Sequence, residues 1–304
     1  MSEHPFLRPN RLKRIGSGLG PLMPAARKFR DMVQSAGRGF FGALLAPPLR
    51  ALPLGLRLRV AEALRHTRRR IDFAPAPLYL EVASPGEIQR LHPCAKEPET
   101  VQWLLDHAGR EFVLFDIGAN VGAYSLIAAA CDPLARVIAF EPGYATYPRL
   151  VDNIRVNSLA DRVSALQVAL GHRTAILDFG YSALDAGAAD HPGIGRGAPQ
   201  TACATHPVLC YRLDDLVTVF DLPLPTLLKL DVDGAELSVL QGATATLRSP
   251  ELRSILVEVR EHEAETADVA ELLGSAGFIE TGGRIHEGGV VRNSIWDRAE
   301  GTRP

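Results

Sequence analysis

The chain has 304 residues, of which 46% are hydrophobic and 22% are charged, and this composition excludes a disordered protein. The formal net charge of −2 hides an asymmetry, because residues 1–70 hold 15 of the 33 basic residues and only 3 of the 35 acidic ones. The basic end therefore has a different role or environment from the rest of the chain. No aromatic residues interleave with the arginines of residues 55–70, so we expect no nucleic-acid partner.

The N-terminal part is expected to be a partly helical extension over residues 1–75, with the main domain over 76–304. The apolar segment Gly39–Leu49 is too short to span a bilayer and lacks the arrangement of a signal peptide. Its flanking arginines would allow peripheral contact with the inner face of a membrane. The alternative, which we favour, is an arm that packs on its own domain or on a partner subunit.

An amphipathic helix is expected at 55–70, because leucine and valine recur there at every fourth residue. Arg68–Arg70 at its end would suit the helix dipole. The four cysteines form no C-x-x-C pair, which is typical of reduced thiols in a cytoplasmic protein. The sequence leaves the oligomeric state open.

Helices and strands alternate through the main domain. Ser84–Glu87 carries the residues of a capping box with proline at the first helical position, and a second short helix is expected at Thr100–Ala108. Strands are expected at 112–117, 136–141, 163–169, 226–232, 254–259, 278–284 and 290–297. This alternation predicts an α/β fold with a mostly parallel sheet and right-handed crossovers.

The stretch Ala186–Pro207 is rich in glycine, proline, alanine and histidine. It is expected to be a long loop over the carboxyl edge of the sheet, where such loops act as lids or binding segments. His191 and His206 are candidates for contact with a substrate. The alternative, which is the more frequent case for loop histidines, is that both are solvated.

The most informative segment is Glu111–Tyr124, where a buried strand ends at Asp116 and a glycine-rich turn opens a helix. Gly118, Asn120 and Gly122 follow at every second position, and these residue types tolerate positive φ. The turn lets the backbone approach a ligand closely, and the helix N-terminus points free N–H groups toward that ligand. We therefore expect a nucleotide-type site at this strand end.

The spacing of the loop distinguishes between nucleotide cofactors. The dinucleotide fingerprint needs a third glycine that this loop lacks, whereas an acidic residue followed by Gly-x-Asn-x-Gly is typical of class I methyltransferases that bind S-adenosylmethionine. The next strand ends at Glu141 and Pro142, and a carboxylate there accepts both ribose hydroxyl protons. That carboxylate alone does not distinguish S-adenosylmethionine from NAD, because both contain an adenosine ribose.

Further blocks follow in order along the chain: NIRVN at Asn153–Asn157, VAL at Val168–Leu170, LDDL at Leu213–Leu216, LLKLDVDGAELSVLQGA at Leu227–Ala243 and ILVEV at Ile255–Val259. In this order and spacing the chain resembles the FkbM family of S-adenosylmethionine-dependent methyltransferases over about residues 95 to 297. One departure is Asp233, which stands where the family has glutamate.

The resemblance implies a class I methyltransferase fold, Rossmann-like, with a seven-stranded mostly parallel sheet, helices on both faces and an antiparallel last strand. It also implies that the cofactor is S-adenosyl-L-methionine and that the acceptor is a hydroxyl group of a sugar, glycan or secondary metabolite. The residues that it assigns to cofactor binding are Asp116, Gly118, Ala119, Asn120, Gly122, Glu141, Pro142, Ala169 and Asp231.

The expected catalytic residues are Lys229, Asp231, Asp233 and Glu258. In a sheet of order 3-2-1-4-5 the fourth strand ends beside the cofactor loop, which would place Asp231, Asp233 and Glu236 near the transferred methyl group. Lys229 faces the same side as Asp231, and a lysine in an apolar strand needs a carboxylate partner. Asp231 is the candidate partner. The pair has either a structural role or a catalytic one, and the sequence favours neither.

Asp231, Asp233 and Glu258 together offer ligands for one Mg²⁺, which would acidify a diol. We favour a site without metal, because carboxylates near a sulfonium are useful without one. The general base is then a carboxylate or a loop histidine.

Two other functions are compatible with parts of the sequence. A non-catalytic member of the same fold would bind the cofactor or a partner, and the departure at Asp233 leaves loss of catalysis open. An NAD-dependent oxidoreductase is disfavoured by the Gly-x-Asn-x-Gly spacing. The sequence does not name the acceptor.

Overall fold

The computed structural model describes residues 51–65, 67–181, 186–187, 203–260, 264–286 and 290–299. The chain divides into two compact units, Met1–Leu64 and Arg65–Pro304, and each is described by itself. The second unit begins eleven residues before residue 76, where the main domain was expected to start. The apolar segment at 39–49 lies outside the described residues. Within the described ranges, no helix has the length and apolar character needed to cross a bilayer.

The expected helix at 55–70 is shorter than predicted. Helix α2 is Leu54–Arg65, and the arginines that follow lie in strand β1 (Thr67–Arg70). This strand pairs antiparallel with β2 (Tyr79–Val82), so its backbone groups are satisfied by a sheet and not by a helix. Ile71 and Phe73, directly after β1, are buried in the core and hold the strand in place.

The large sheet has seven strands in the order β11-β12-β10-β9-β3-β4-β5. They are β3 (Val113–Ile117), β4 (Arg136–Phe140), β5 (Val163–Leu166), β9 (Leu227–Leu230), β10 (Ser254–Arg260), β11 (Phe278–Ile285) and β12 (Val291–Arg298). The five strands from β10 to β5 are mutually parallel, and β12 runs antiparallel to both of its neighbours. The seven expected strands, their order and the antiparallel last strand are confirmed, but the strand expected at 163–169 ends at Leu166, and Ala169 belongs to another sheet.

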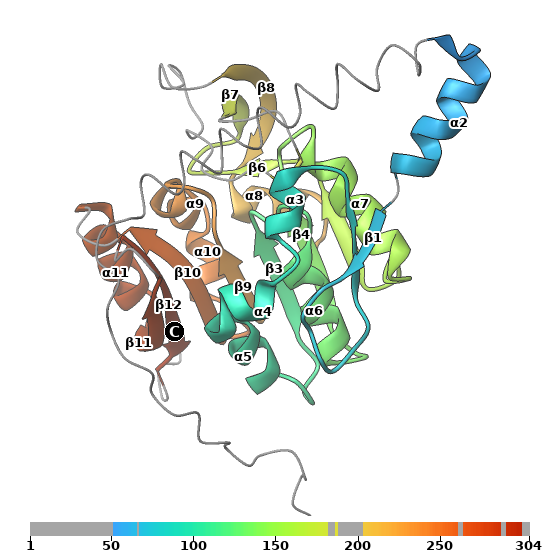
Figure 1. Ribbon diagram of the computed structural model, residues 1–304. Coiled ribbons are helices and arrows are strands. Elements are labelled where there is room, and N and C mark those ends of the chain that lie inside the picture. The colour runs from blue at the N-terminus through green and yellow to red at the C-terminus, as the bar shows by residue number, and fades with distance from the viewer. Residues whose placement is uncertain are drawn as a thin grey trace, which may run out of the picture. The chain divides into compact units, whose positions relative to one another are not determined.

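Helices cover both faces of this sheet (Figure 1). Leu114 packs into a core cluster with α6 (Ala123–Cys131) and α7 (Thr146–Val156), and α5 (Pro98–Asp106) joins the same cluster. The neighbouring Phe115 and Ile117 pack into a second cluster on the opposite face. The helices of that face are α8 (Leu213–Val219), α9 (Glu236–Gln241), α10 (Thr244–Arg248) and α11 (Ala264–Ser275). The alternation follows from the two-residue period of a strand.

Two short helices precede α5. Helix α3 (Pro85–Gln89) begins with the predicted capping box, in which Ser84 accepts a hydrogen bond from the backbone N–H of Glu87. Helix α4 (Pro93–Lys96) follows and leads into α5 through Glu97. The prediction of a capped helix at 84–87 is confirmed.

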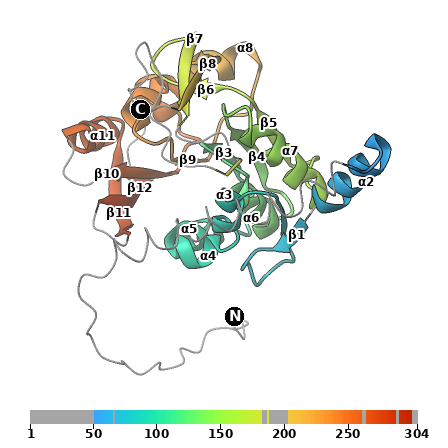
Figure 2. The same ribbon diagram turned by 45° about the horizontal axis from the view of Figure 1, so that its top comes forward.

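A small second sheet lies beyond the carboxyl end of β5. It has the order β6-β8-β7, with β6 (Ala169–Leu170), β7 (Ala175–Tyr181) and β8 (Ala204–Tyr211), and Figure 2 shows it beside α8. The expected loop at 186–207 is therefore wrong at its end, because residues 204–207 pair with β7. Of the rest of that stretch, residues 186–187 and 203 are described.

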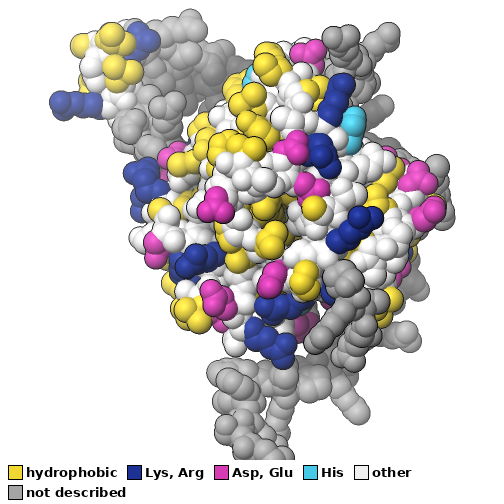
Figure 3. All heavy atoms as spheres, turned by 180° about the vertical axis from the view of Figure 1, so that it is seen from behind, with side chains coloured by type: hydrophobic (Ala, Val, Ile, Leu, Met, Phe, Trp, Pro, Cys, Tyr) yellow, Lys and Arg dark blue, Asp and Glu magenta, His cyan; other side chains and the backbone are white. Residues whose placement is uncertain are grey.

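The surface mixes both charge signs. On the face shown in Figure 3, lysine, arginine, aspartate and glutamate side chains are interspersed among hydrophobic ones. Such a mixed surface is typical of a folded domain in water.

Candidate active site

The loop after β3 has the backbone conformation predicted from its residues. Gly118, Asn120 and Gly122 have φ values of 81°, 51° and 88°, all in the left-handed region. A Cβ atom on Gly118 would lie 1.8 Å from the carbonyl oxygen of Asp231. The backbone of the loop therefore packs directly against the end of β9, at a distance that only glycine allows.

Beneath this loop lies a buried group of charges. Lys229 Nζ lies 3.0 Å from Asp231 Oδ2 and 3.8 Å from Asp116 Oδ1, and the lysine side chain is 2% exposed. Ser125 donates a 2.5 Å hydrogen bond to the other Asp116 oxygen. The predicted pairing of Lys229 with Asp231 is confirmed. Lys229 Nζ also lies over the ring of Tyr124, 5.1 Å from the ring centroid, which adds a cation–π contact.

The charges of this group shift one another's pKa. Burial lowers the pKa of Lys229, but the negative charges of Asp231 and Asp116 outweigh burial and raise it. Burial raises the pKa of Asp231, and here the positive charge of Lys229 outweighs it, so the net change is downward. Both groups are therefore ionised at neutral pH. The pKa of Asp116 is raised because burial exceeds the effects of Lys229 and Ser125.

Glu141 lies at the end of β4, directly beside the loop. Its Oε2 accepts a hydrogen bond from the N–H of Asn120 at 2.9 Å, and its Oε1 accepts one from the N–H of Gly143 at 2.8 Å. Burial raises its pKa to about 7, against the lowering effect of these two N–H groups. Because a carboxylate has about four acceptor positions, each oxygen retains capacity for one more donor.

A cavity of about 720 Å³ opens at this edge of the sheet. One part of its wall combines the loop and Glu141 with apolar side chains from the β5–β6 connection and β7. The other part combines acidic and basic side chains from α3, α4, β10 and β11. The lining residues include Gly118, Asn120, Glu141, Pro142, Val168, Ala169, Leu170, Phe179, Asp231, Asp233, Glu258, Arg90, Lys96, Arg284 and His286.

Three carboxylates converge at this end of the cavity, two on its wall and one buried behind it. Oxygen atoms of Glu97, Asp231 and Glu258 lie within 4.8 Å of one another. The expected trio of Asp231, Asp233 and Glu258 is thus replaced by one that contains Glu97. The charge of Asp231 is the main cause that raises the pKa of Glu258 to about 9, with burial next. Glu258 therefore holds a proton at neutral pH, which relieves the repulsion within the trio.

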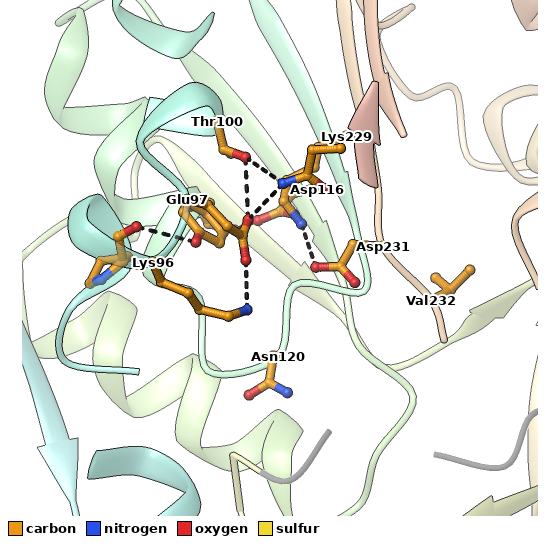
Figure 4. A network of polar contacts seen from close by, with 12 residues as sticks. Lys96, Glu97, Thr100, Asp116, Asn120, Lys229, Asp231 and Val232 are labelled. Atoms are coloured by element: carbon orange, nitrogen blue, oxygen red, sulfur yellow. Dashed lines mark hydrogen bonds and ion pairs between the residues drawn. The ribbon is translucent and has the colours of Figure 1, made fainter. Parts of the chain in front are cut away.

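Glu97 closes this cluster from the side of α5. Its side chain is 1% exposed, its Oε1 lies 2.6 Å from Lys96 Nζ, and its Oε2 accepts a hydrogen bond from Thr100 Oγ1 at 3.2 Å (Figure 4). The figure also shows Lys229 and Asp231 on the neighbouring strand end, facing the same space. The charges of α4 and β9 are thus brought together although more than 130 residues separate them in the sequence.

The structure divides the expected site residues into two groups. Those that line the cavity are Gly118, Asn120, Glu141, Pro142, Ala169, Asp231, Asp233 and Glu258. The remaining ones, Asp116, Ala119, Gly122 and Lys229, are buried behind the cavity wall, where they support the loop and the end of β9. Glu236 also lies behind the wall, and it accepts hydrogen bonds from the N–H groups of Val232 and Gly234.

The two histidines of the expected loop have different positions. His191 lies outside the described residues. His206 lies on β8 and stacks on Tyr181 with ring centroids 5.5 Å apart, and its Nδ1 is 3.1 Å from the Tyr181 hydroxyl. It is not among the residues that line the cavity.

Several residues of the cavity were not predicted from the sequence. Arg90 and Lys96 come from the α3–α4 region, Phe179 comes from β7, and Arg284 and His286 come from the end of β11 and the residue after it. Glu97, which joins the cluster from behind the wall, was also not predicted. The prolines before α4 and α5 indicate helix starts, yet no signal in the sequence indicates that these helices face the end of β9.

The sheet order, the glycine loop after β3 and the carboxylate after β4 together define a class I methyltransferase fold. The sequence profile described as the methyltransferase FkbM domain matches residues 116–280, which is more than half of the chain. The chain therefore belongs to the FkbM methyltransferase family.

The chain is also similar to individual proteins. The chain is 30% identical over 203 residues to the hexuronic acid methyltransferase AglP of Haloferax volcanii, with 64% of this chain and 75% of the relative covered. It is 28% identical over 189 residues to methyltransferase sdnD of Sordaria araneosa, with 54% and 73% covered. A solved structure of methyltransferase FkbM from Methylobacillus flagellatus aligns with 14% identity and a TM-score of 0.46, covering 68% of this chain and 61% of that one.

Proposed function

We propose that the protein transfers a methyl group from S-adenosylmethionine to an oxygen atom of a saccharide or other small-molecule acceptor. Bound S-adenosylmethionine supplies an electrophilic methyl group on a positively charged sulfur. The name of the Haloferax volcanii relative, a hexuronic acid methyltransferase, supports a saccharide as the acceptor.

The loop after β3 carries this proposal. Gly118 lies so close to the Asp231 carbonyl that no side chain fits there. The wall of the cavity at this point is therefore loop backbone, which leaves room for a ligand. Glu141 retains acceptor capacity for the two hydroxyl groups of a ribose. Ala169, Leu170 and Phe179 form an apolar wall next to it that suits the faces of an adenine ring. The residues present therefore fit the proposed cofactor.

The acidic end of the cavity supports a role in proton transfer. Asp231 is held ionised by Lys229, so it stabilises positive charge in its neighbourhood. Because Glu258 holds a proton at neutral pH, we assign acceptance of the acceptor's hydroxyl proton to the ionised carboxylate of Asp231. Glu258 is assigned to donate a hydrogen bond to the acceptor. Asp233 on the cavity wall is assigned to orientation of the acceptor. The carboxylate oxygens of the trio also suit Mg²⁺, although this proposal does not require it.

Calorimetric titration with S-adenosylmethionine tests the proposal. The wild type is expected to bind it, and Glu141→Ala is expected to weaken binding at least about 10-fold, since the ribose loses a charged hydrogen-bond acceptor. Glu271→Ala, which removes an exposed carboxylate from α11, is the control and is expected to bind as the wild type does. Binding of NAD in place of S-adenosylmethionine would contradict the proposal.

A further inference from the structure

The part of the cavity that Glu141 and the apolar wall do not occupy is lined by four basic side chains. Arg90 directly follows α3 and Lys96 ends α4, whereas Arg284 lies in β11 and His286 directly follows it. These elements are far apart in the sequence and meet only in the folded protein. Basic side chains that converge on a cavity favour an anionic ligand.

Three of these side chains have a carboxylate partner on the protein. Lys96 Nζ lies 2.6 Å from Glu97, and Glu99 is shared by Arg284 at 3.6 Å and His286 at 3.2 Å. Each of these three basic groups therefore has a carboxylate oxygen within ion-pair distance. Arg90 is the remaining basic side chain, and it is the one that we consider as a binding group for an anion.

Arg90 differs from the other three in its contacts. Its Nε donates a 3.3 Å hydrogen bond to the carbonyl oxygen of Gly187, and no carboxylate of the described residues lies within ion-pair distance of its guanidinium. A guanidinium has five N–H donors, and this contact uses the inner one. The two outer nitrogens form the edge that binds a carboxylate through two parallel hydrogen bonds.

The position of Arg90 is fixed by helix α3. The helix starts with a full capping box, and the buried carboxylate of Glu87 also forms an ion pair with Arg149 of α7, with Nε and Oε1 2.5 Å apart. Ser84 donates a hydrogen bond to the carbonyl of Ala186, next to the residue that Arg90 contacts. A guanidinium held on such an anchored helix is preorganised for a ligand.

The charge of Arg90 acts on the cavity. Burial is the main cause that raises the pKa of Glu141, and the positive charge of Arg90 opposes it. The pKa of Asp231 is also lowered in part by Arg90, after the larger contribution of Lys229. The guanidinium is therefore electrostatically coupled to two carboxylates that line the cavity, Glu141 and Asp231.

We propose that Arg90 binds a carboxylate group of the acceptor, which makes an acidic saccharide such as a uronic acid the substrate class of this cavity. This inference rests on the proposed function, since it assigns the other part of the cavity to S-adenosylmethionine. A carboxylate is also present on the amino-acid end of that cofactor. The two sources share one chemistry, and the experiment must distinguish them.

Saturation-transfer NMR with sodium glucuronate and with glucose, both in the presence of saturating S-adenosylhomocysteine, measures the preference for the acid. The wild type is expected to bind glucuronate in preference to glucose. Arg90→Gln retains a donor for Gly187 but loses the charge and the paired donors, and it is expected to weaken glucuronate binding about 10- to 100-fold. Arg155→Gln on α7 is the matched control, because this arginine is 72% exposed and does not line the cavity.

Calorimetry with S-adenosylhomocysteine and with methylthioadenosine is the second experiment. Because methylthioadenosine lacks the amino-acid carboxylate, the comparison shows whether Arg90 binds the carboxylate of the cofactor. Unchanged affinity of Arg90→Gln for both, together with loss of glucuronate binding, supports the proposal. Weakened binding of S-adenosylhomocysteine alone would assign the carboxylate to the cofactor and overturn the acceptor assignment. If the wild type binds the cofactor but shows no preference for glucuronate, this inference is overturned and the proposed function stands. If the wild type does not bind the cofactor, the proposed function is overturned as well.

Discussion

At the scale of single residues, the proton on Glu258 makes the stability of the protein depend on pH. Its pKa of about 9 in the folded state lies above its ordinary value of 4.5, mainly because of the neighbouring charge of Asp231. A carboxyl group with a raised pKa stabilises the folded state fully below pH 4.5, and this contribution is lost as pH rises toward 9.

Glu258→Gln is therefore expected to gain stability relative to the wild type as pH rises through this window. The gain can reach about 1.4 kcal/mol per pH unit, because one proton is linked to folding. Urea unfolding at pH 5, 6.5 and 8 measures it, and Glu271→Gln on α11 controls for a general effect of charge. A constant difference between Glu258→Gln and the wild type would show that Glu258 is ionised throughout.

Gly118 allows a second prediction at this scale. Gly118→Ala adds a methyl group where the Asp231 carbonyl lies and imposes a left-handed φ on alanine. We expect the free energy of unfolding to fall by about 2–4 kcal/mol. Gly274→Ala in α11 meets open space and is expected to stabilise by about 0.5–1 kcal/mol. Equal effects of the two substitutions in denaturant titrations would contradict the close packing of the loop.

The residues of the site differ in how far the sequence predicts them. The pair of Lys229 and Asp231 is predictable, because a lysine inside an apolar strand requires a partner and the two-residue period of the strand indicates which one. Glu97 and Arg90 are not predictable in this way. They lie between short helices whose orientation depends on packing against α6 and α7, and local sequence does not encode that packing.

At the scale of elements, the two asparagines of the NIRVN motif join α7 to β2. Asn157 accepts a hydrogen bond from the N–H of Tyr79 and donates one to its carbonyl, at 2.9 and 2.7 Å. Asn153 accepts from the N–H of Glu81 and donates to the carbonyl of Val121, both at 2.8 Å. The two side chains thus bind backbone groups along one edge of β2, as a neighbouring strand would. Asn153 also connects β2 to the cofactor loop, through Val121.

Asn153→Ala is expected to lower the free energy of unfolding by about 2–4 kcal/mol, because it leaves a buried donor and a buried acceptor without partners. It should also weaken binding of S-adenosylmethionine, since the loop loses the contact at Val121. Asn157→Ala, at the exposed end of the same helix, should cost only about 0.5–1.5 kcal/mol and leave the affinity unchanged. Thermal unfolding and calorimetry on both variants measure these losses. A larger loss of stability or affinity in Asn157→Ala than in Asn153→Ala would contradict the prediction.

The elements themselves are largely predictable. Strands β3, β4, β9 and β10 follow from apolar runs, since strands buried on both faces show continuous hydrophobicity. Strands β11 and β12 contain many polar residues, and the helix end at Gly277 indicates where β11 begins. The hairpin of β7 and β8 was not predicted, because Pro207 interrupts β8 and Ile176 is 70% exposed. The proline is tolerated because β6 pairs with Cys210 and Tyr211, and no described strand pairs with the other edge of β8 at residue 207.

At the scale of the whole molecule, the compact unit that begins at Arg65 is expected to hold the cofactor site alone. A chain that starts at Arg65 should retain the S-adenosylmethionine affinity of the full chain. A chain that starts at residue 76 should be less stable by several kcal/mol, since it lacks β1 and the buried side chains of Ile71 and Phe73. Calorimetry and denaturant unfolding of both truncations check this, and loss of affinity in the longer one would place the N-terminal arm in the cofactor site.

The central claim is that the loop after β3 and the carboxylate after β4 hold S-adenosylmethionine. A crystal structure with bound S-adenosylhomocysteine tests it most directly. We predict that both ribose hydroxyl groups lie within hydrogen-bond distance of Glu141, that the adenine contacts Ala169 and Leu170, and that the amino-acid end passes over Gly118. A ligand bound elsewhere, or a ribose that does not contact Glu141, would contradict the account.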